Sequence, residues 1–160
     1  MSLPGFFRKL FSPRQPSSQL GSLSRFALFG GLTPVELAIV EGLLHRREYL
    51  AGEVIFDEGE EGQAIYLIDT GEVELLRRGR NGPERIATLE PGAFFGDMAL
   101  LDDLPRLAQA RARAPTRLFA FFREDFHTLM DTHARIASKI ALALAREMGR
   151  RLRVQASGEE

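Results

Sequence analysis

The chain has 160 residues, 44% of them hydrophobic, and a formal net charge of −1 at pH 7, which suits one domain with a single core and gives no argument for nucleic acid or an acidic substrate. The absence of cysteine excludes disulfides, thiolate metal sites and cysteine nucleophiles. No apolar run approaches the length of a membrane span and the N-terminus lacks an apolar signal core, so we expect a cytoplasmic protein.

The N-terminal segment 1–24 is predicted to be a flexible basic tail in front of one domain, 25–156. Residues 1–25 are rich in proline, serine and glycine and contain four basic and no acidic residues. Since the whole chain carries −1, removing the +4 of this segment leaves −5, and this change of composition marks the boundary. The apolar and basic stretch 6–11 would make only weak contact with an anionic membrane or dock to a partner.

A helix is predicted to begin at Pro34. Thr33, Pro34 and Glu36 form a capping box with proline at the first helical position. Apolar side chains then repeat with helical spacing as far as Leu44.

From Glu48 to Arg123 the apolar side chains alternate with a period of two, which predicts short antiparallel strands separated by glycine turns. Asn81 followed by Gly82 indicates a hairpin between two of these strands. Alternating alanines at 108–114 give one strand a small face. The pattern predicts a mostly β fold with flanking helices, built as an antiparallel jelly-roll barrel.

Two helices are predicted after the strands, one over 124–130 and a long one from a Thr132 cap to about Arg153. The apolar stripe of the long helix consists of Ile136, Ile140, Leu144 and Met148. Because such a stripe is costly to leave in water, we expect it to form a homodimer with its copy or, alternatively, to fold back over the binding pocket. Arginines at the C-terminal end of the helix complement its dipole.

The stretch 94–106 combines the parts of a small anion site. Two aromatic residues predict the end of a strand, Gly96 permits a tight turn, and a short helix over 98–101 would direct free N–H groups outward. Arg106 adds a guanidinium that matches phosphate oxygens, and the Asp97 carboxylate is suited to a sugar hydroxyl. A phosphate and a ribose hydroxyl together predict a nucleotide.

The same residues also permit a purely structural interpretation. Asp97 is a preferred helix cap, and Arg106 has two carboxylates nearby in the sequence, Asp102 and Asp103. In that interpretation neither residue binds a ligand. The residues alone favour neither interpretation.

The sequence FFGDMALLDDLPRLAQARA resembles the phosphate-binding cassette of the cyclic-nucleotide-binding domain family, whose members show Phe-Gly-Glu, Ala-Leu-Leu and Pro-Arg-Ala-Ala at these places. That family includes catabolite-activator-type regulators and the regulatory subunits of cyclic-AMP-dependent kinase. The resemblance covers about 26–153, because glycines before the cassette also follow the family's order. It implies that the chain shares the family's fold and its ligand.

The resemblance assigns a role to each part of this cassette. The residues that it places around the cyclic phosphate are Gly96, Met98, Ala99 and Arg106, the middle two through their backbone. It implies that Asp97 binds the ribose hydroxyl and that Leu75 and Ile86 form the wall of the pocket. It also implies that the terminal helix covers the base.

Two positions depart from the family's pattern. Asp97 is one methylene shorter than the usual glutamate, so its carboxylate needs a water or a backbone shift to reach the hydroxyl. Leu107 replaces the small residue that follows the arginine, and its bulk is expected to crowd the phosphate or the purine. It also lacks the hydroxyl that cyclic-GMP binders commonly offer.

The resemblance therefore implies a regulatory module that binds a cyclic purine mononucleotide, cyclic AMP before cyclic GMP, without an output domain of its own. One alternative is a degenerate member of the family that works as a dimerising or protein-docking module. A second is a module that binds another messenger such as cyclic di-GMP. The sequence does not identify a protein partner.

Catalysis, cofactors and metal binding are not expected. None of the three histidines, His45, His127 and His133, lies on a predicted strand, and no pair has metal-ligand spacing. Neither a nucleophile elbow nor Gly-x-Gly-x-x-Gly is present. The segment 154–160 is too short for a recognition helix with its support, so we expect no direct DNA binding.

Overall fold

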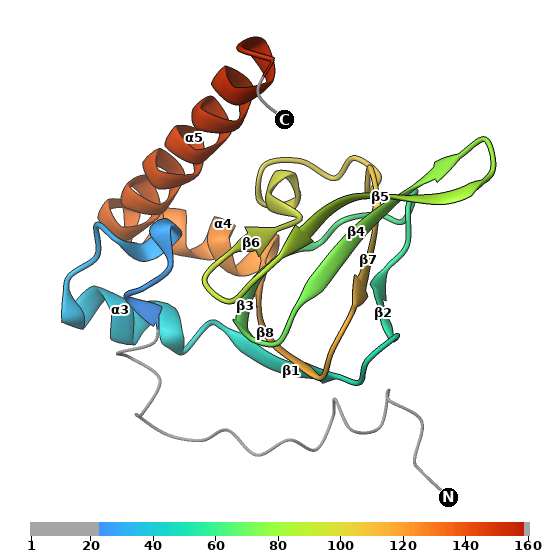
Figure 1. The fold of residues 1–160 in the computed structure, drawn as a ribbon. Coiled ribbons are helices and arrows are strands. Elements are labelled where there is room, and N and C mark those ends of the chain that lie inside the picture. Colours follow the sequence, from blue (N-terminus) through green and yellow to red (C-terminus); the bar gives the residue numbers. More distant parts are fainter. Residues whose placement is uncertain (1–22, 159–160) are drawn as a thin grey trace, which may run out of the picture.

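Two four-stranded antiparallel sheets carry the fold, and Figure 1 shows the main helices gathered at one side of them. The computed structural model describes residues 23–158. The first sheet has the order β1 (His45–Tyr49), β8 (Thr116–Phe122), β3 (Ala64–Thr70) and β6 (Phe94–Phe95). The second has the order β2 (Val54–Phe56), β7 (Gln109–Ala112), β4 (Val73–Gly79) and β5 (Gly82–Leu89). The helical elements are η1 (Ala27–Phe29), α3 (Pro34–Glu41), η2 (Asp97–Leu100), α4 (Arg123–Thr132) and α5 (Ala134–Ala156).

The prediction of a mostly β, antiparallel fold with flanking helices is confirmed, but the sheets do not close into a barrel. Within residues 23–158 no strand ladder joins the first sheet to the second. Two of the edge strands, β6 and β2, have only two and three residues, which is too little backbone to continue a ladder around a corner. The architecture is therefore a two-sheet roll.

The core has two parts, separated by the first sheet. One apolar cluster lies between that sheet and the helices and includes Phe119 and Phe121 of β8. The other lies between the two sheets and includes Phe56 of β2, Phe95 of β6 and Leu118 of β8. Since successive strand residues face opposite sides, β8 contributes to both clusters, and the central strands β3 and β8 of the first sheet are mostly buried on both faces.

The hairpin predicted at Asn81 joins β4 to β5, but its turn lies one residue earlier than expected. Gly79 pairs with Gly82, so Arg80 and Asn81 form the turn. Gly82 has φ +110°, a backbone conformation that side chains disfavour. The sequence pattern thus located the hairpin, and the positive φ of Gly82 is the reason why glycine stands directly after the two turn residues.

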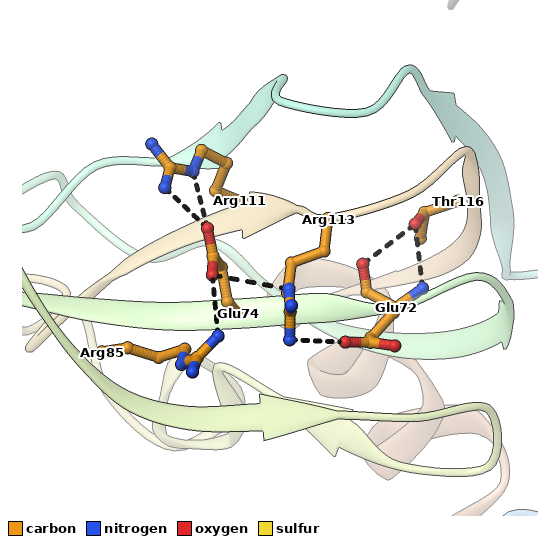
Figure 2. A network of polar contacts seen from close by, with 6 residues as sticks. All are labelled: Glu72, Glu74, Arg85, Arg111, Arg113 and Thr116. Atoms are coloured by element: carbon orange, nitrogen blue, oxygen red, sulfur yellow. Dashed lines mark hydrogen bonds and ion pairs between the residues drawn. The ribbon is translucent and has the colours of Figure 1, made fainter.

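Charged side chains hold the second sheet together on its outer surface. Figure 2 shows the Glu74 carboxylate of β4 between arginines of the two neighbouring strands. Glu74 is 8% exposed; its Oε1 lies 2.6 Å from Arg111 Nη2 of β7, and its Oε2 lies 3.9 Å from Arg85 Nη1 of β5. Arg113 bridges Glu74 and Glu72 at 3.8 and 2.9 Å. The network links the three strands β4, β5 and β7 through their side chains.

The capping box predicted for the first helix is present at the start of α3. The Glu36 amide donates to the Thr33 hydroxyl, and the Thr33 amide donates to the Glu36 carboxylate. Lys139 of α5 also donates to that carboxylate, at 2.6 Å. This hydrogen bond and the one from Thr33 hold the pKa of Glu36 below its ordinary value.

The long helix α5 differs from the prediction in two ways. Its N-cap residue is His133 without a side-chain cap, while the Thr132 hydroxyl donates to the Thr128 carbonyl. The predicted stripe is not left for a partner: Ile136, Ile140 and Leu144 are buried in the helix-side cluster of the same chain, with Met148 packed at its edge. The cost of exposing the stripe is therefore removed within one molecule.

The predicted tail and its stretch 6–11 lie outside the described residues, apart from the last two positions of 1–24. Leu23 is fully buried in the helix-side cluster. The domain boundary at residue 25 stays a prediction, but the core already includes Leu23. Among residues 23–158, no helix combines the length and the hydropathy needed to cross a membrane.

Candidate functional site

Gly96 turns the chain from strand β6 into the short helix η2. Its φ is +71°, in the left-handed region that favours glycine. A Cβ at this position would also lie 2.4 Å from the Arg106 Nη1 atom. Two independent requirements therefore select glycine here: the backbone turn and the close approach of the arginine.

Arg106 is a buried cation at the centre of the cassette. The residue is 9% exposed, its guanidinium carbon lies 4.1 Å from the centre of the Phe56 ring, and its Nη atoms donate to the carbonyls of Gly96 and Ala64 at 3.1 and 2.7 Å. Its Nε is buried without a hydrogen-bond partner. Burial lowers the pKa of Arg106.

No carboxylate of the described chain forms an ion pair with Arg106. The surface pair with Asp102 or Asp103, offered by the structural interpretation, is not present in this part of the chain; the Asp102 carboxylate instead accepts from the Leu104 amide. Carbonyl oxygens satisfy part of the guanidinium, but they carry no net charge to offset it. A compact anion would supply that charge.

Backbone bonds and a second arginine fix the position of the cassette. The Arg106 amide donates to the Glu60 carbonyl, and the Gly59 amide donates to the Arg106 carbonyl. Arg123, the first residue of α4, donates to the carbonyls of Gly62, Ala99 and Asp102. These hydrogen bonds hold the turn before β3, the helix η2 and the start of α4 together, so the Arg106 guanidinium has a defined location.

Asp97 is buried beside this frame and is bound by the terminal helix. It is 8% exposed and does not cap η2; its Oδ1 accepts from Arg151 Nη1 at 3.0 Å. Arg151 also donates to the Phe94 carbonyl at 3.4 Å, and its guanidinium lies 5.4 Å from the centre of the Phe94 ring. Sequence reasoning assigned the arginines of this helix end to the helix dipole and missed this pair.

The other residues assigned from the resemblance are distributed less tightly. Ala99 is buried beside Arg106, whereas Met98 of η2 is exposed. Leu75 of β4 packs against the inter-sheet cluster, and Ile86 of β5 is 47% exposed.

Leu107 is 74% exposed, and the expectation that it crowds a bound phosphate or purine stays a prediction.

The histidines are placed differently from the prediction. His45 lies on a strand, as the first residue of β1, although none was expected there. Its Nε2 is 3.7 Å from an Asp125 carboxylate oxygen of α4, and its ring packs edge-on against Phe122. In the part of the chain that the structure describes, no group of three potential ligands is arranged to hold a metal ion.

Comparison with known proteins decides the family. Residues 46–133, more than half of the chain, match the family model of the cyclic nucleotide-binding domain. The chain belongs to this family. Over 122 residues it is 43% identical to the Cyclic AMP receptor protein of Thermus thermophilus, a match that covers 76% of this chain and 56% of that protein. It is also 35% identical over 108 residues to the cAMP-dependent protein kinase regulatory subunit of Emericella nidulans, covering 68% of this chain and 26% of that subunit.

Solved structures of this family share the fold. The crystal structure of Thermus thermophilus Catabolite Activator Protein has a TM-score of 0.74 and 40% identity, covering 82% of this chain and 61% of that one. The regulatory domain of Toxoplasma gondii PKA, crystallised with cAMP, has a TM-score of 0.66 at 21% identity, covering 79% and 48%, and shows the fold alone. The cyclic nucleotide-binding domain here thus spans little more than half of the bacterial relative and about a quarter of the fungal one.

Proposed function

We propose that this domain is a regulatory module that binds a cyclic mononucleotide, cyclic AMP in the first place, and does not catalyse a reaction. The observation that carries the proposal is Arg106: a guanidinium buried in the cassette, with an unpaired Nε and without an ion pair among residues 23–158. A buried charge without a counter-charge is costly. A bound phosphate would offset that cost, so the site favours an anionic ligand.

The cassette supports a nucleotide over a free phosphate. Gly96 brings the start of η2 close to Arg106, and Asp97 lies beside it as an acceptor for a ribose hydroxyl. In the proposed complex the phosphate contacts Arg106 and the backbone around Met98, and the base lies toward Leu75 and Ile86.

Cyclic AMP is preferred to cyclic GMP because Leu107 offers no hydroxyl to a guanine. The names of the bacterial relative and of the kinase subunit both refer to cyclic AMP.

Thermal unfolding of the purified chain tests this proposal directly. A ligand that binds the folded state raises the melting temperature by an amount that follows its concentration over its Kd. We expect cyclic AMP to raise it more than cyclic GMP and cyclic di-GMP, with linear 5′-AMP as the control for a phosphate that is not cyclic. No shift with any cyclic nucleotide at millimolar concentration would favour the degenerate, protein-docking module instead.

A second proposal concerns association through α5. With the predicted stripe buried, the helix exposes a different face, on which Leu142, Ala145, Gly149 and Leu152 follow each other at spacings of three and four residues. Leu142 and Leu152 are large exposed apolar side chains, and the small residues between them permit close approach of a second helix. We therefore propose a homodimer through this face.

Sedimentation of the wild type and of Leu142→Glu measures the association. We expect a dimer at micromolar concentration for the wild type and a monomer for the variant, because a buried carboxylate opposes the contact. Ala143→Glu, one residue along the helix, is the control for the added charge. A wild type that stays monomeric at high micromolar concentration would contradict the dimer.

A further inference from the structure

The cassette segment 98–107 presents several apolar side chains to solvent. Its four large exposed apolar residues are Met98, Leu101, Leu104 and Leu107, between 42% and 74% exposed. The amides of Leu101 and Asp102 both donate to the Met98 carbonyl, and the Leu104 amide donates to the Asp102 carboxylate, so most of this segment is folded into one compact turn. Single exposed apolar residues are common, but apolar residues gathered in this way mark a contact surface.

Carboxylates accompany these apolar side chains. An antiparallel bridge between Glu61 and Pro105, and the hydrogen bond from the Arg106 amide to the Glu60 carbonyl, hold the turn before β3 against segment 98–107. The carboxylates that this arrangement brings to one region belong to Glu60, Glu61, Asp102 and Asp103. Of these, only Glu61 has an ion-pair partner among residues 23–158, at 3.9 Å. The surface therefore suits a partner that is both apolar and basic.

The N-terminal stretch 6–11 has this complementary composition. Four of its six residues are apolar, three of them phenylalanine, and the other two are Arg8 and Lys9. Residues 1–22 contain three basic and no acidic residues. Opposite charge favours the encounter and orients it, and the phenylalanines supply apolar area to bury.

The length of the chain permits this contact within one molecule. Leu23 and Leu100 of η2 belong to the same buried cluster, so the described chain begins on the side of the first sheet where η2 packs. Eleven residues, 12–22, connect stretch 6–11 to Leu23, and they span up to about 36–40 Å when extended. A domain of this size has a radius of gyration of about 14 Å. Such a tether gives an effective concentration of about millimolar, so a weak contact is enough.

We propose that residues 6–11 dock on segment 98–107 of the same chain, with the phenylalanines against the exposed leucines and the two cations toward the carboxylates. The contact removes from water an apolar surface that the folded domain leaves exposed. This inference is independent of the proposed function, because the docking surface needs no bound ligand.

Paramagnetic relaxation enhancement tests the contact in the full chain. Because the sequence has no cysteine, Ser12→Cys provides a single position for a spin label directly after stretch 6–11. We expect selective broadening of the amide signals of 98–107 and of the neighbouring turn at Glu60 and Glu61. A label that broadens no amide of this region, or that broadens all exposed amides alike, would overturn the proposal.

Two variants of the labelled chain make the test specific to the apolar surface. Leu101→Ser with Leu104→Ser removes two exposed leucines, and we expect the selective broadening to be lost. Val35→Ser is the matched control, since Val35 on α3 is 72% exposed, and it should keep the broadening. Broadening that persists in the double variant would show that the leucines do not form the docking surface.

A mixture of two chains decides whether the contact is intramolecular. One chain carries the isotope label without a spin label, and the other carries the spin label without the isotope. We expect no selective broadening in the mixture, because each stretch 6–11 occupies its own domain. Broadening equal to that of the doubly labelled chain would assign the stretch to a second copy and overturn docking within one chain.

Discussion

Two buried charged side chains in this domain have opposite surroundings. Glu74, on the outer surface of the second sheet, has three arginines within ion-pair distance (Figure 2). Arg106, in the cassette, is equally buried but donates to two carbonyls and stacks on Phe56, without a carboxylate partner in the described chain. Glu74 has direct ion-pair partners in the fold, and Arg106 has none among residues 23–158.

The difference separates a structural role from a binding role. A fold that uses a charge for stability surrounds it with counter-charges, since an uncompensated buried ion is destabilising. A binding site does the reverse, because a charge already neutralised inside the protein gains little from a ligand. We therefore expect substitutions at Glu74 to change stability and substitutions at Arg106 to change binding.

The largest effect is expected for Arg106→Ala. Binding of cyclic AMP should fall about a hundredfold or more, because the phosphate loses its buried counter-charge. The melting temperature without ligand should change little, since the variant also removes an uncompensated charge. Calorimetric titration and thermal unfolding measure the two quantities, and Arg80→Ala in the β4–β5 turn is the control for lost positive charge. If Arg106→Ala instead lowers the melting temperature and leaves the affinity of the folded protein unchanged, Arg106 has a structural role and not a binding role.

Glu74→Gln should show the opposite pattern. Removing the carboxylate leaves three arginines facing one another, and we expect the free energy of unfolding to fall by about 1–2 kcal/mol, a value reduced from that of a fully buried pair because the arginines are partly exposed. Affinity for cyclic AMP should stay within about twofold. Urea unfolding is the measurement, with Glu84→Gln on the exposed strand β5 as the control. A binding defect without a stability defect would show that the network serves the site.

Substitutions at the two unusual cassette positions should have smaller effects on binding. Leu107→Ala is expected to change the affinity less than about threefold, because the leucine is largely exposed. Asp97→Ala should cost less than Arg106→Ala, since a hydrogen bond to a ribose contributes less than the phosphate contact. Titration of both variants provides the comparison.

The double variant Asp97→Glu with Leu107→Ala restores the residue types of the family's pattern. A change from undetectable to clear binding of cyclic AMP in this variant would mean that the natural domain is a repurposed module. Equal binding by the wild type and the double variant would show that both residues are accommodated.

The smallest effect concerns a charge at the edge of the core. The pKa of Glu36 is lowered by Lys139 and by the Thr33 amide, so its contribution to stability is present above its ordinary pKa of 4.5 and is lost as the pH falls through the lower folded value. Glu36→Gln keeps the cap but removes the charge. We expect its melting temperature to lie below that of the wild type at pH 7 and the gap to close below about pH 4.5. A gap independent of pH would assign the effect to the cap.

Local chemistry made much of the fold predictable. The capping box at Thr33 and the hairpin at Asn81 depend on residues within a few positions of one another, and both are present. The two-residue period and the helical stripe predicted the class of each segment. The resemblance of the cassette predicted the family, which the comparison confirms.

The larger errors concern contacts between distant parts of the chain. Whether the two sheets close depends on the edge strands β2 and β6. The burial of the α5 stripe depends on η1 and β8, which both precede α5 by more than ten residues. Asp97 and Arg151 lie 54 positions apart. The sequence alone does not indicate which of the many arginines forms an ion pair with this carboxylate. Periodicity describes a face of a helix but not the surface that covers it.

The buried stripe of α5 also determines which segment of the chain can be transferred to another protein as a folded domain. The family model matches residues 46–133, yet the outer face of the first sheet is covered by Leu23, Phe26, Phe29, Ile136 and Ile140. A recombination event that moved only the matched segment into another protein would keep α4 on this face of the sheet but would remove the rest of the apolar side chains that pack around Phe119 and Phe121. A domain transferred between proteins therefore has to include the helical segments before and after the matched residues 46–133. A second domain fused to either end would then be attached directly to an element of the core.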